Sequence, residues 1–320
     1  MNARTYVPWN TVLVLALIGC SSDDGGPSQP PADVQVLAGN NQEALVGQLV
    51  AGALRVVVRD AGNAPVRGAT VDWVLTVGDG SLSAASSKTD GAGAAQTRLT
   101  LGSTPGPRVV TATVGSLGPV TFTVLGFMAV VDPADQFSTG ASAGAIPPEI
   151  TRLSAASDGN ALQVRIDFAA TVVPEATGGP NVLIALLDLD TDQSASTGIE
   201  PNTDFFRPGT GSTGMGADYV VGLFEPYQLV RTSDSTVVGT VTPVFSGTRV
   251  ALSIPLALLG ADDGGVNLAV VVGTLAEPTD IAPNNGNLTL PPPTGASADR
   301  ADPLARSTAR TPARVWGRWR

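Results

Sequence analysis

Short runs in which apolar and polar positions alternate recur along most of this chain. Residues 54–59, 70–75 and 249–255 each place apolar side chains on every second position. Because successive side chains of a strand point to opposite faces, this pattern predicts strands with one buried face. Turn formers such as residues 60–63 and 89–93 separate the runs, and no sustained helical stripe follows the N-terminus. The pattern therefore predicts an all-β protein.

The alternating runs fall into two groups. Residues 33–126 hold roughly seven short runs with regular turn signals, which predicts an antiparallel β-sandwich. Trp73 is expected in its core, with ligand stacking as the alternative. Residues 127–290 predict a second, larger antiparallel β-sandwich, with one helical turn at residues 255–260. The strands expected there are Ile150–Ala155, Leu162–Phe168, Val182–Leu189, Asp218–Phe224, Tyr227–Thr232, Val237–Thr242, Arg249–Pro255 and Val266–Gly273.

Composition narrows the function classes. Among 320 residues 43% are hydrophobic and 14% charged, and 37 Gly and 25 Pro supply turns. The lack of His removes the usual base of Ser-His-Asp and Cys-His catalysis. No acid pair stands out as a glycosidase pair, so we expect no catalytic residues and no enzymatic activity. A net charge of −10 argues against nucleic acid, whose phosphates require Lys and Arg.

The N-terminal segment predicts export and a lipid anchor. Residues 11–19 form an apolar run of signal-peptide length that is too short to span a membrane. The sequence Leu-Ile-Gly-Cys at its end resembles the bacterial lipobox. The resemblance implies a signal peptide over residues 1–19, lipidation of Cys20 and a flexible tether over residues 20–32. The alternative is an ordinary secretory signal with a chance cysteine.

Two further features bear on location. By resemblance to Gram-negative sorting rules, Ser21 favours the outer membrane of the cell envelope, if the host is Gram-negative. Residues 291–320 are rich in Pro and Arg and are expected to form a disordered tail. This tail either binds an anionic surface or has no role of its own.

The first sandwich carries the signatures of a known family. Residues 56–71 (VVVRDAGNAPVRGATV) resemble the opening of a bacterial Ig-like domain of the invasin/intimin type. Residues 89–95 (TDGAGAA) resemble its second signature, and residues 109–113 resemble its closing strand. The resemblance implies an Ig-like β-sandwich over residues 33–126, of the kind that serves as a spacer on adhesins.

Three aspartates occupy alternate positions near the end of a predicted strand. Asp188, Asp190 and Asp192 gather carboxylate oxygens, the ligands that calcium prefers. Without a cation such close carboxylates repel one another. We therefore expect calcium here, with Asp218 as a more distant ligand; the alternative is an acidic, solvated turn without an ion. The loop is not an EF-hand, because Gln193 stands where that loop has Gly.

Residues 188–198 and the sequence Gly-Ala-Asp-Tyr at 216–219 resemble extracellular β-sandwich domains similar to carbohydrate-binding jelly rolls, which often hold structural calcium. Asp132 and Asp135 resemble the acidic segment that starts such domains. Residues 262–265 are expected to form a turn without a ligand role. Aromatic residues that either stack on sugars or, as we expect for most of them, lie in the core are Phe205, Phe206, Tyr219, Phe224 and Tyr227.

These features predict a non-enzymatic lipoprotein of the cell surface. Its Ig-like domain would be a spacer that presents a calcium-stabilised sandwich for adhesion or glycan binding. One alternative is a structural envelope protein that acts through protein–protein contacts, and another is a glycan-active enzyme. The expected partners are the membrane, through the lipid anchor, and a glycan or an envelope protein.

Overall fold

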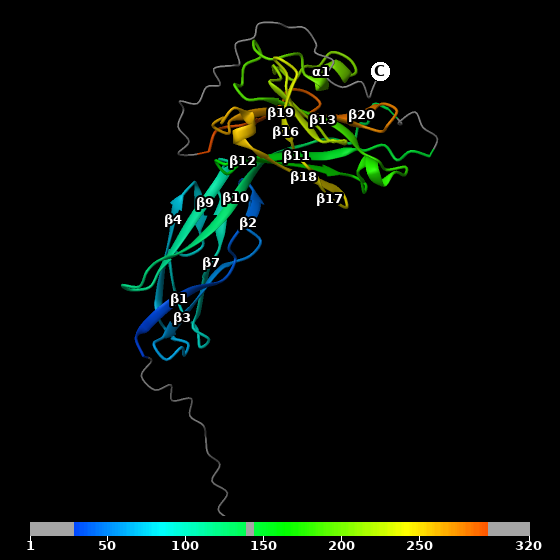
Figure 1. Ribbon diagram of the computed structural model, residues 1–320. Coiled ribbons are helices and arrows are strands. Elements are labelled where there is room, and N and C mark those ends of the chain that lie inside the picture. Colours follow the sequence, from blue (N-terminus) through cyan, green and yellow to red (C-terminus); the bar gives the residue numbers. More distant parts are fainter. Residues whose placement is uncertain (1–28, 139–143, 294–320) are drawn as a thin grey trace, which may run out of the picture.

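Two β-sandwiches joined end to end form the described part of the protein (Figure 1). The computed structural model describes residues 29–138 and 144–293. The predicted signal peptide, Cys20 and the predicted C-terminal tail from residue 294 onward lie outside these ranges. Strands dominate the described residues and the helices there are single turns, so the all-β prediction is confirmed.

The first sandwich packs a small sheet against part of a larger one. The small sheet has the order β1-β3-β7. The larger sheet contributes β6, β4, β9 and β10, with β2 added parallel to β10. A separate antiparallel pair joins β5 to β8. The strands are β1 (Pro31–Ala38), β2 (Gln42–Leu45), β3 (Leu54–Asp60), β4 (Thr70–Val77), β5 (Gly80–Leu82), β6 (Ser86–Lys88), β7 (Ala94–Thr97), β8 (Leu99–Leu101), β9 (Gly106–Thr113) and β10 (Val120–Val131).

Alternation along these strands builds the core of the first sandwich. On β4, Val71 and Trp73 are buried while the alternating residues Thr70, Asp72 and Val74 are exposed. The Trp73 ring packs against Phe122, with ring centroids 5.9 Å apart, and its indole N–H donates to Ser87 Oγ at 2.9 Å. Trp73 is therefore a core residue, as predicted, and its polar atom is satisfied internally.

Two aspartates shape the turns that carried the family signatures. Asp60 Oδ1 accepts the backbone N–H groups two and four residues further on, both at 2.9 Å. Asp90 Oδ1 likewise accepts the N–H groups two and four residues after it, at 2.8 and 2.9 Å. Such bonds satisfy backbone donors that a tight turn leaves free. The N–H groups of Ala94 and Ala92 hold the pKa of Asp90 below its ordinary value.

Strand β10 belongs to both sandwiches. Its first part pairs with β9, from Val120 to Gly126. Its last part, from Met128 to Val131, pairs with β11 (Ile150–Ser157) of the second sandwich. One hydrogen-bonded sheet thus runs through both sandwiches. The boundary expected between residues 126 and 127 falls inside this strand.

Side chains reinforce the junction around β10. The backbone N–H of Val46, which follows β2, donates to the carbonyl of Phe127 at 2.9 Å. Arg165 places its guanidinium carbon 3.9 Å from the centre of the Phe127 ring and forms an ion pair with Glu43 of the first sandwich. A cation over an aromatic face is attracted by the ring quadrupole. Backbone and side-chain contacts therefore both link the two sandwiches.

The second sandwich consists of two antiparallel sheets. The first has the order β17-β18-β12-β11 and continues into β10. The second has the order β16-β15-β14-β13-β19-β20, and β21 also pairs with β19. The elements are η1 (Glu175–Thr177), α1 (Asn202–Phe206), η2 (Leu256–Leu259), β12 (Ala161–Phe168), β13 (Ile184–Asp190), β14 (Tyr219–Gly222), β15 (Gln228–Arg231), β16 (Thr236–Thr240), β17 (Val244–Ser246), β18 (Arg249–Pro255), β19 (Val266–Gly273), β20 (Pro278–Ala282) and β21 (Leu288–Leu290).

Most expected elements of the second sandwich are present. All eight predicted strands have a counterpart. The predicted helical turn is η2, which Pro255 precedes and Gly260 follows in the left-handed conformation (φ 75°). The pattern did not predict η1, α1, β17, β20 or β21. Of these, α1 and β20 carry residues of the sites described below.

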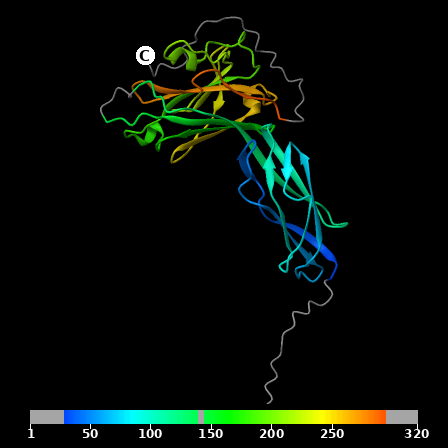
Figure 2. The same ribbon diagram turned by 180° about the vertical axis from the view of Figure 1, so that it is seen from behind.

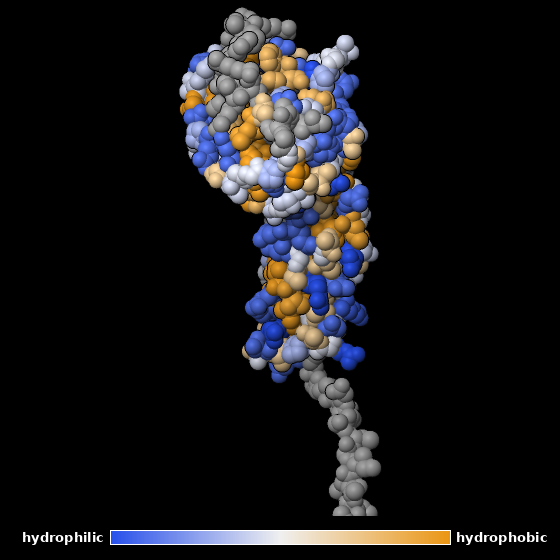
Figure 3. Space-filling model, turned by 90° about the vertical axis from the view of Figure 1, so that its right-hand side faces the viewer, coloured by the Kyte–Doolittle hydropathy of each residue, from blue (hydrophilic) through white to orange (hydrophobic). Residues whose placement is uncertain are grey.

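The two sandwiches form an elongated molecule. Figure 1 shows β1 toward the end of the first sandwich that is remote from the second, and Figure 2 shows the same blue segment there from behind. On the surface, apolar areas lie on both sandwiches and are interrupted by polar ones (Figure 3). Among the described residues, no helix has the length and apolar character needed to cross a membrane.

Candidate metal centre

Three of the four predicted ligands meet at one end of the second sheet. Asp190 ends β13, Asp192 follows in the next loop, and Asp218 directly precedes β14. Because β13 and β14 are antiparallel neighbours, the end of one lies beside the start of the other. One carboxylate oxygen from each aspartate lies within 4.8 Å of the other two. We call these three residues the loop cluster.

Two glycines allow the loop after β13 to approach the chain before β14. A Cβ on Gly216 would lie 1.8 Å from the carbonyl oxygen of Thr197. A Cβ on Gly198, whose φ is +66°, would lie 2.6 Å from the carbonyl oxygen of Ala217. Only glycine fits such a close backbone approach. The two glycines of the sequence signature therefore bring Asp218 to the other two aspartates.

Donors from the protein hold each carboxylate of the loop cluster. Asp190 accepts the N–H of Ser194 at 3.0 Å and the amide of Asn267 at 3.1 Å. Asp192 accepts the Thr197 hydroxyl at 2.8 Å. Asp218 Oδ2 accepts both the N–H and the hydroxyl of Thr191, each at 2.9 Å. The carboxylates are thereby oriented toward one another, as metal ligands must be.

The electrostatics of the loop cluster favour a positive partner. Burial raises the pKa of Asp218 to about 6, and the charge of Asp192 adds to this. Burial also raises the pKa of Asp190. Within residues 29–138 and 144–293, no Lys or Arg forms an ion pair with any of the three. A hard divalent cation is the partner that such oxygen ligands fit.

Asp188 lies outside the loop cluster. It is fully buried, and its two oxygens accept the side chain of Asn202 at 2.8 Å and the N–H and hydroxyl of Thr203 at 2.8 and 2.7 Å. These donors belong to the start of α1. Burial raises the pKa of Asp188. Its place in the structure is that of an anchor for α1.

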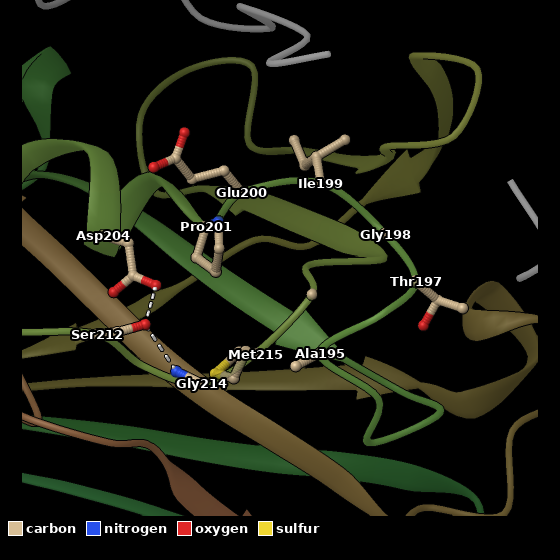
Figure 4. Close-up of a pocket in the computed structure, with 11 residues that line it drawn as sticks. Ala195, Thr197, Gly198, Ile199, Glu200, Pro201, Asp204, Ser212, Gly214 and Met215 are labelled. Atoms are coloured by element: carbon tan, nitrogen blue, oxygen red, sulfur yellow. Dashed lines mark hydrogen bonds between the residues drawn. The ribbon is translucent and has the colours of Figure 1, made fainter. Parts of the chain in front are cut away.

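A hollow of about 410 Å³ is lined in part by Thr197 (Figure 4), whose hydroxyl donates to Asp192 of the loop cluster. Residues 197–201 curve along one side of it, and Ser212, Gly214 and Met215 lie along the other. Asp204 of α1 accepts the Ser212 hydroxyl at 3.1 Å and so ties the two sides together. The hollow combines hydroxyl, carboxylate and apolar side chains, as sites for small polar ligands do.

The five aromatic residues singled out in the sequence differ in burial. Tyr219 and Phe224 are buried in the core. Phe206 is partly buried against a small apolar cluster, and Tyr227 is half-buried. Phe205 is 55% exposed and packs edge-on to Phe206, with ring centroids 4.9 Å apart. Among the five, Phe205 is the one with a largely open ring face.

The second sandwich contains two further groups of acidic residues. Asp262 and Asp263 accept the N–H groups of Gly264 and Gly265 at 2.8 and 2.9 Å, as the predicted turn requires. A second group of aspartates lies elsewhere in the sandwich, formed by Asp132, Asp135 and Asp280. We call this group the junction cluster. The sequence drew attention to Asp132 and Asp135 but missed Asp280, which lies on the unpredicted strand β20.

Comparison with known families places the first sandwich. Residues 40–125 match the family described as bacterial Ig-like domain (group 1). The first sandwich has an Ig-like fold over these residues. The prediction of an Ig-like fold for this part is therefore confirmed. A comparison with the curated proteins gave no match.

Solved structures with some similarity include fragments of intimin. The D00-D0 domain of intimin is 19% identical with a TM-score of 0.24, and the match covers 32% of this chain and 48% of that one. The D0-D1 domain is 12% identical with a TM-score of 0.27 (82% and 96% covered). A fragment of intimin in complex with the intimin-binding domain of its translocated receptor is 15% identical with a TM-score of 0.28 (82% and 64%). This chain thus spans about half of the first structure. At these values the similarity assigns neither a ligand nor a partner.

Proposed function

We propose that this protein is a non-enzymatic lipoprotein of the bacterial cell surface. Its Ig-like domain holds the second sandwich away from an anchor at Cys20, and the second sandwich binds a glycan. The strand shared by both sandwiches carries this proposal. Because β10 pairs with β9 and then with β11, the spacer continues into the module it presents without a linker.

The shape of the molecule supports a presenting role. The chain enters the described region at the end of the Ig-like domain that is remote from the second sandwich (Figure 1). An anchor attached there would place the second sandwich farthest from the membrane. The contacts of Arg165 with Phe127 and Glu43 stiffen the junction. A stiff arm limits the loss of conformational freedom when the presented module binds.

We further propose that calcium at the loop cluster shapes the hollow. Thr197 lines the hollow and donates its hydroxyl to Asp192. Gly198 and Ile199 continue along the same wall. An ion held by Asp190, Asp192 and Asp218 would fix the loop from which this wall is built. Ligand binding would then require calcium.

The chemistry of the hollow suits a sugar. Glu200 and Ser212 offer hydrogen-bonding groups, and Met215 offers an apolar surface. Phe205, whose side chain is exposed, is the next residue in the chain after Asp204, and Asp204 lines the hollow. Aromatic faces beside polar groups bind ligands that have one apolar and one polar side. This combination supports a glycan as the ligand.

The test is binding of the purified chain to an array of glycans and envelope polysaccharides, in calcium and in chelator. We expect binding in calcium that Asp192→Asn weakens about tenfold or more. Phe205→Ala should also weaken it, whereas Val244→Ala should not, because that exposed residue lies on β17 of the other sheet. Equal binding in calcium and chelator would contradict the role of the ion.

The alternative is a structural envelope protein that acts through protein–protein contacts. If no glycan binds in either condition, the glycan proposal fails and this alternative takes its place. Cross-linking on intact cells would then identify the neighbouring protein. The shared strand and the stiff junction fit both functions, so the ligand decides between them.

A further inference from the structure

The junction cluster joins two parts of the second sandwich that are distant in sequence. Asp132 directly follows β10, Asp135 lies in the loop after it, and Asp280 lies on β20. One carboxylate oxygen from each lies within 4.8 Å of the other two. Asp132 and Asp280 are 5% and 1% exposed, whereas Asp135 is exposed. The cluster is thus buried on one side and reaches solvent at Asp135.

One oxygen of this cluster lacks a partner in the described structure. Asp132 Oδ2 is buried and receives no hydrogen bond from the described residues. Its other oxygen accepts the amide of Asn284 at 3.3 Å. A buried acceptor without a partner costs free energy, and more so when it carries charge. The nearly complete burial of Asp132 therefore leaves this oxygen available to a ligand from outside the described residues.

The surroundings add negative charge to the cluster. Glu149 lies nearby, and its two oxygens accept the N–H groups of Asp135 and Gln136 at 3.0 and 3.2 Å. In the described ranges no Lys or Arg forms an ion pair with any of these four acids. Burial raises the pKa of Asp132 to about 7, and the charges of Asp135 and Glu149 add to this.

We propose that Asp132, Asp135 and Asp280 bind a divalent cation with a preference for hard oxygen ligands, for which calcium is the best fit. Three carboxylates supply part of the six to eight oxygens that calcium takes. Solvent at the exposed Asp135 supplies the rest. Glu149 is a positioning residue, because both of its oxygens already hold the backbone beside Asp135.

The ion would connect the two sheets of the second sandwich. β10 belongs to the sheet that continues from the Ig-like domain, and β20 belongs to the opposite sheet. The N–H of Ile150 already donates to Asp280 Oδ2 at 2.7 Å, so the two sheets meet here through a carboxylate. A cation between Asp132 and Asp280 makes this contact stronger. It therefore fixes the second sandwich against the strand that leads in from the spacer.

The junction cluster can be tested independently of the loop cluster. Calcium binding to the full chain is measured by isothermal titration, and thermal unfolding is followed in calcium and in chelator. The Asp190→Asn variant removes the loop cluster, and we expect it to retain calcium bound at the junction cluster. Adding Asp132→Asn to that variant should abolish the remaining binding. If the double variant binds calcium as the single variant does, the proposal is overturned.

Two further variants separate ion binding from a merely structural role. Asp135→Asn changes an exposed carboxylate that makes no hydrogen bond within the described residues. It should weaken calcium binding about tenfold or more and raise the melting temperature in chelator slightly, because the charge of Asp135 acts on buried Asp132. Above pH 7, where the Asp132 carboxyl is ionised, Asp132→Asn should raise the melting temperature in chelator, because it removes an unpaired buried charge, and lower it relative to the unchanged chain in calcium. Asp72→Asn, an exposed site in the Ig-like domain, is the matched control. A melting temperature that Asp132→Asn lowers equally in both conditions would also overturn the proposal.

Discussion

The two acidic clusters of the second sandwich differ in how their oxygens are satisfied. In the loop cluster, backbone, amide and hydroxyl donors reach all three carboxylates. In the junction cluster, Asp132 has a buried oxygen without a partner, and Asp135 makes no side-chain hydrogen bond to the described residues. The first cluster is thus organised by its own loop, and the second is organised by the meeting of two sheets.

An ion bound at each cluster should stabilise a different part of the second sandwich. Because the loop cluster is held by local donors, an ion there should mainly order residues 190–198 and the hollow beside them. An ion in the junction cluster should stabilise the whole second sandwich, since it joins elements from opposite sheets. Calcium should therefore act on ligand binding through one cluster and on global unfolding through the other.

The largest expected effect is that of Gly216→Ala, which should destroy the loop cluster alone. The new Cβ would lie 1.8 Å from the carbonyl oxygen of Thr197, so the loop must move. We expect a loss of about 3 kcal/mol of stability and loss of calcium binding at the loop cluster. Calorimetry in calcium and in chelator measures both.

Calcium binding at the junction cluster should survive in the same variant. Gly118→Ala is the control, because its Cβ would meet nothing within 4 Å. A Gly216→Ala chain with unchanged stability would show that the loop is not held by this close approach. The comparison between the two clusters would then lose its structural basis.

The sequence predicted strands well where one face is buried. β12 and β18 alternate strictly between buried and less buried residues, and both were predicted. β20 is buried at four of its five positions, so its residues show no alternation. Gly126 was read as a domain boundary, yet β10 continues through it because Gly106 pairs with it on β9. A pairing of this kind depends on residues distant in sequence.

The sequence predicted the loop cluster only in part. Asp190 and Asp192 meet Asp218 because β13 and β14 are neighbours, which the candidate strands suggested. Asp188 shares a face of β13 with Asp190, but the unpredicted helix α1 covers it. The partner-free oxygen of Asp132 could not be predicted, because a missing hydrogen bond becomes visible only in the folded chain.

Asp188→Asn should separate the buried anchor from the metal ligands. All present partners of the Asp188 carboxylate donate hydrogen bonds to it. The side-chain amide of the variant would place its own N–H₂ donor against a donor of Asn202 or Thr203, so one hydrogen bond would be lost. We expect a loss of about 2 kcal/mol of stability, with calcium binding to the loop cluster retained. Urea unfolding and calcium titration measure the two effects. Loss of calcium binding with unchanged stability would instead make Asp188 a ligand.

The smallest expected effect concerns Asp262, which belongs to neither cluster. Burial raises its pKa to about 7, and the charges of Asp263 and Asp218 add to this. The unfolded chain holds this proton only up to about pH 4. Between these values the folded state binds the proton more tightly, so the stability contributed by Asp262 is complete at pH 4 and is lost as the pH rises to 7.

Asp262→Asn removes this titration and keeps an oxygen for the N–H of Gly264. The melting temperature of the unchanged chain, relative to the variant, should therefore fall by a few degrees between pH 4 and pH 7. The fall should be similar in calcium and in chelator, because Asp262 lies outside both clusters. A fall that disappears in calcium would instead join Asp262 to the loop cluster through Asp218. It would show that the loop cluster is larger than its three aspartates.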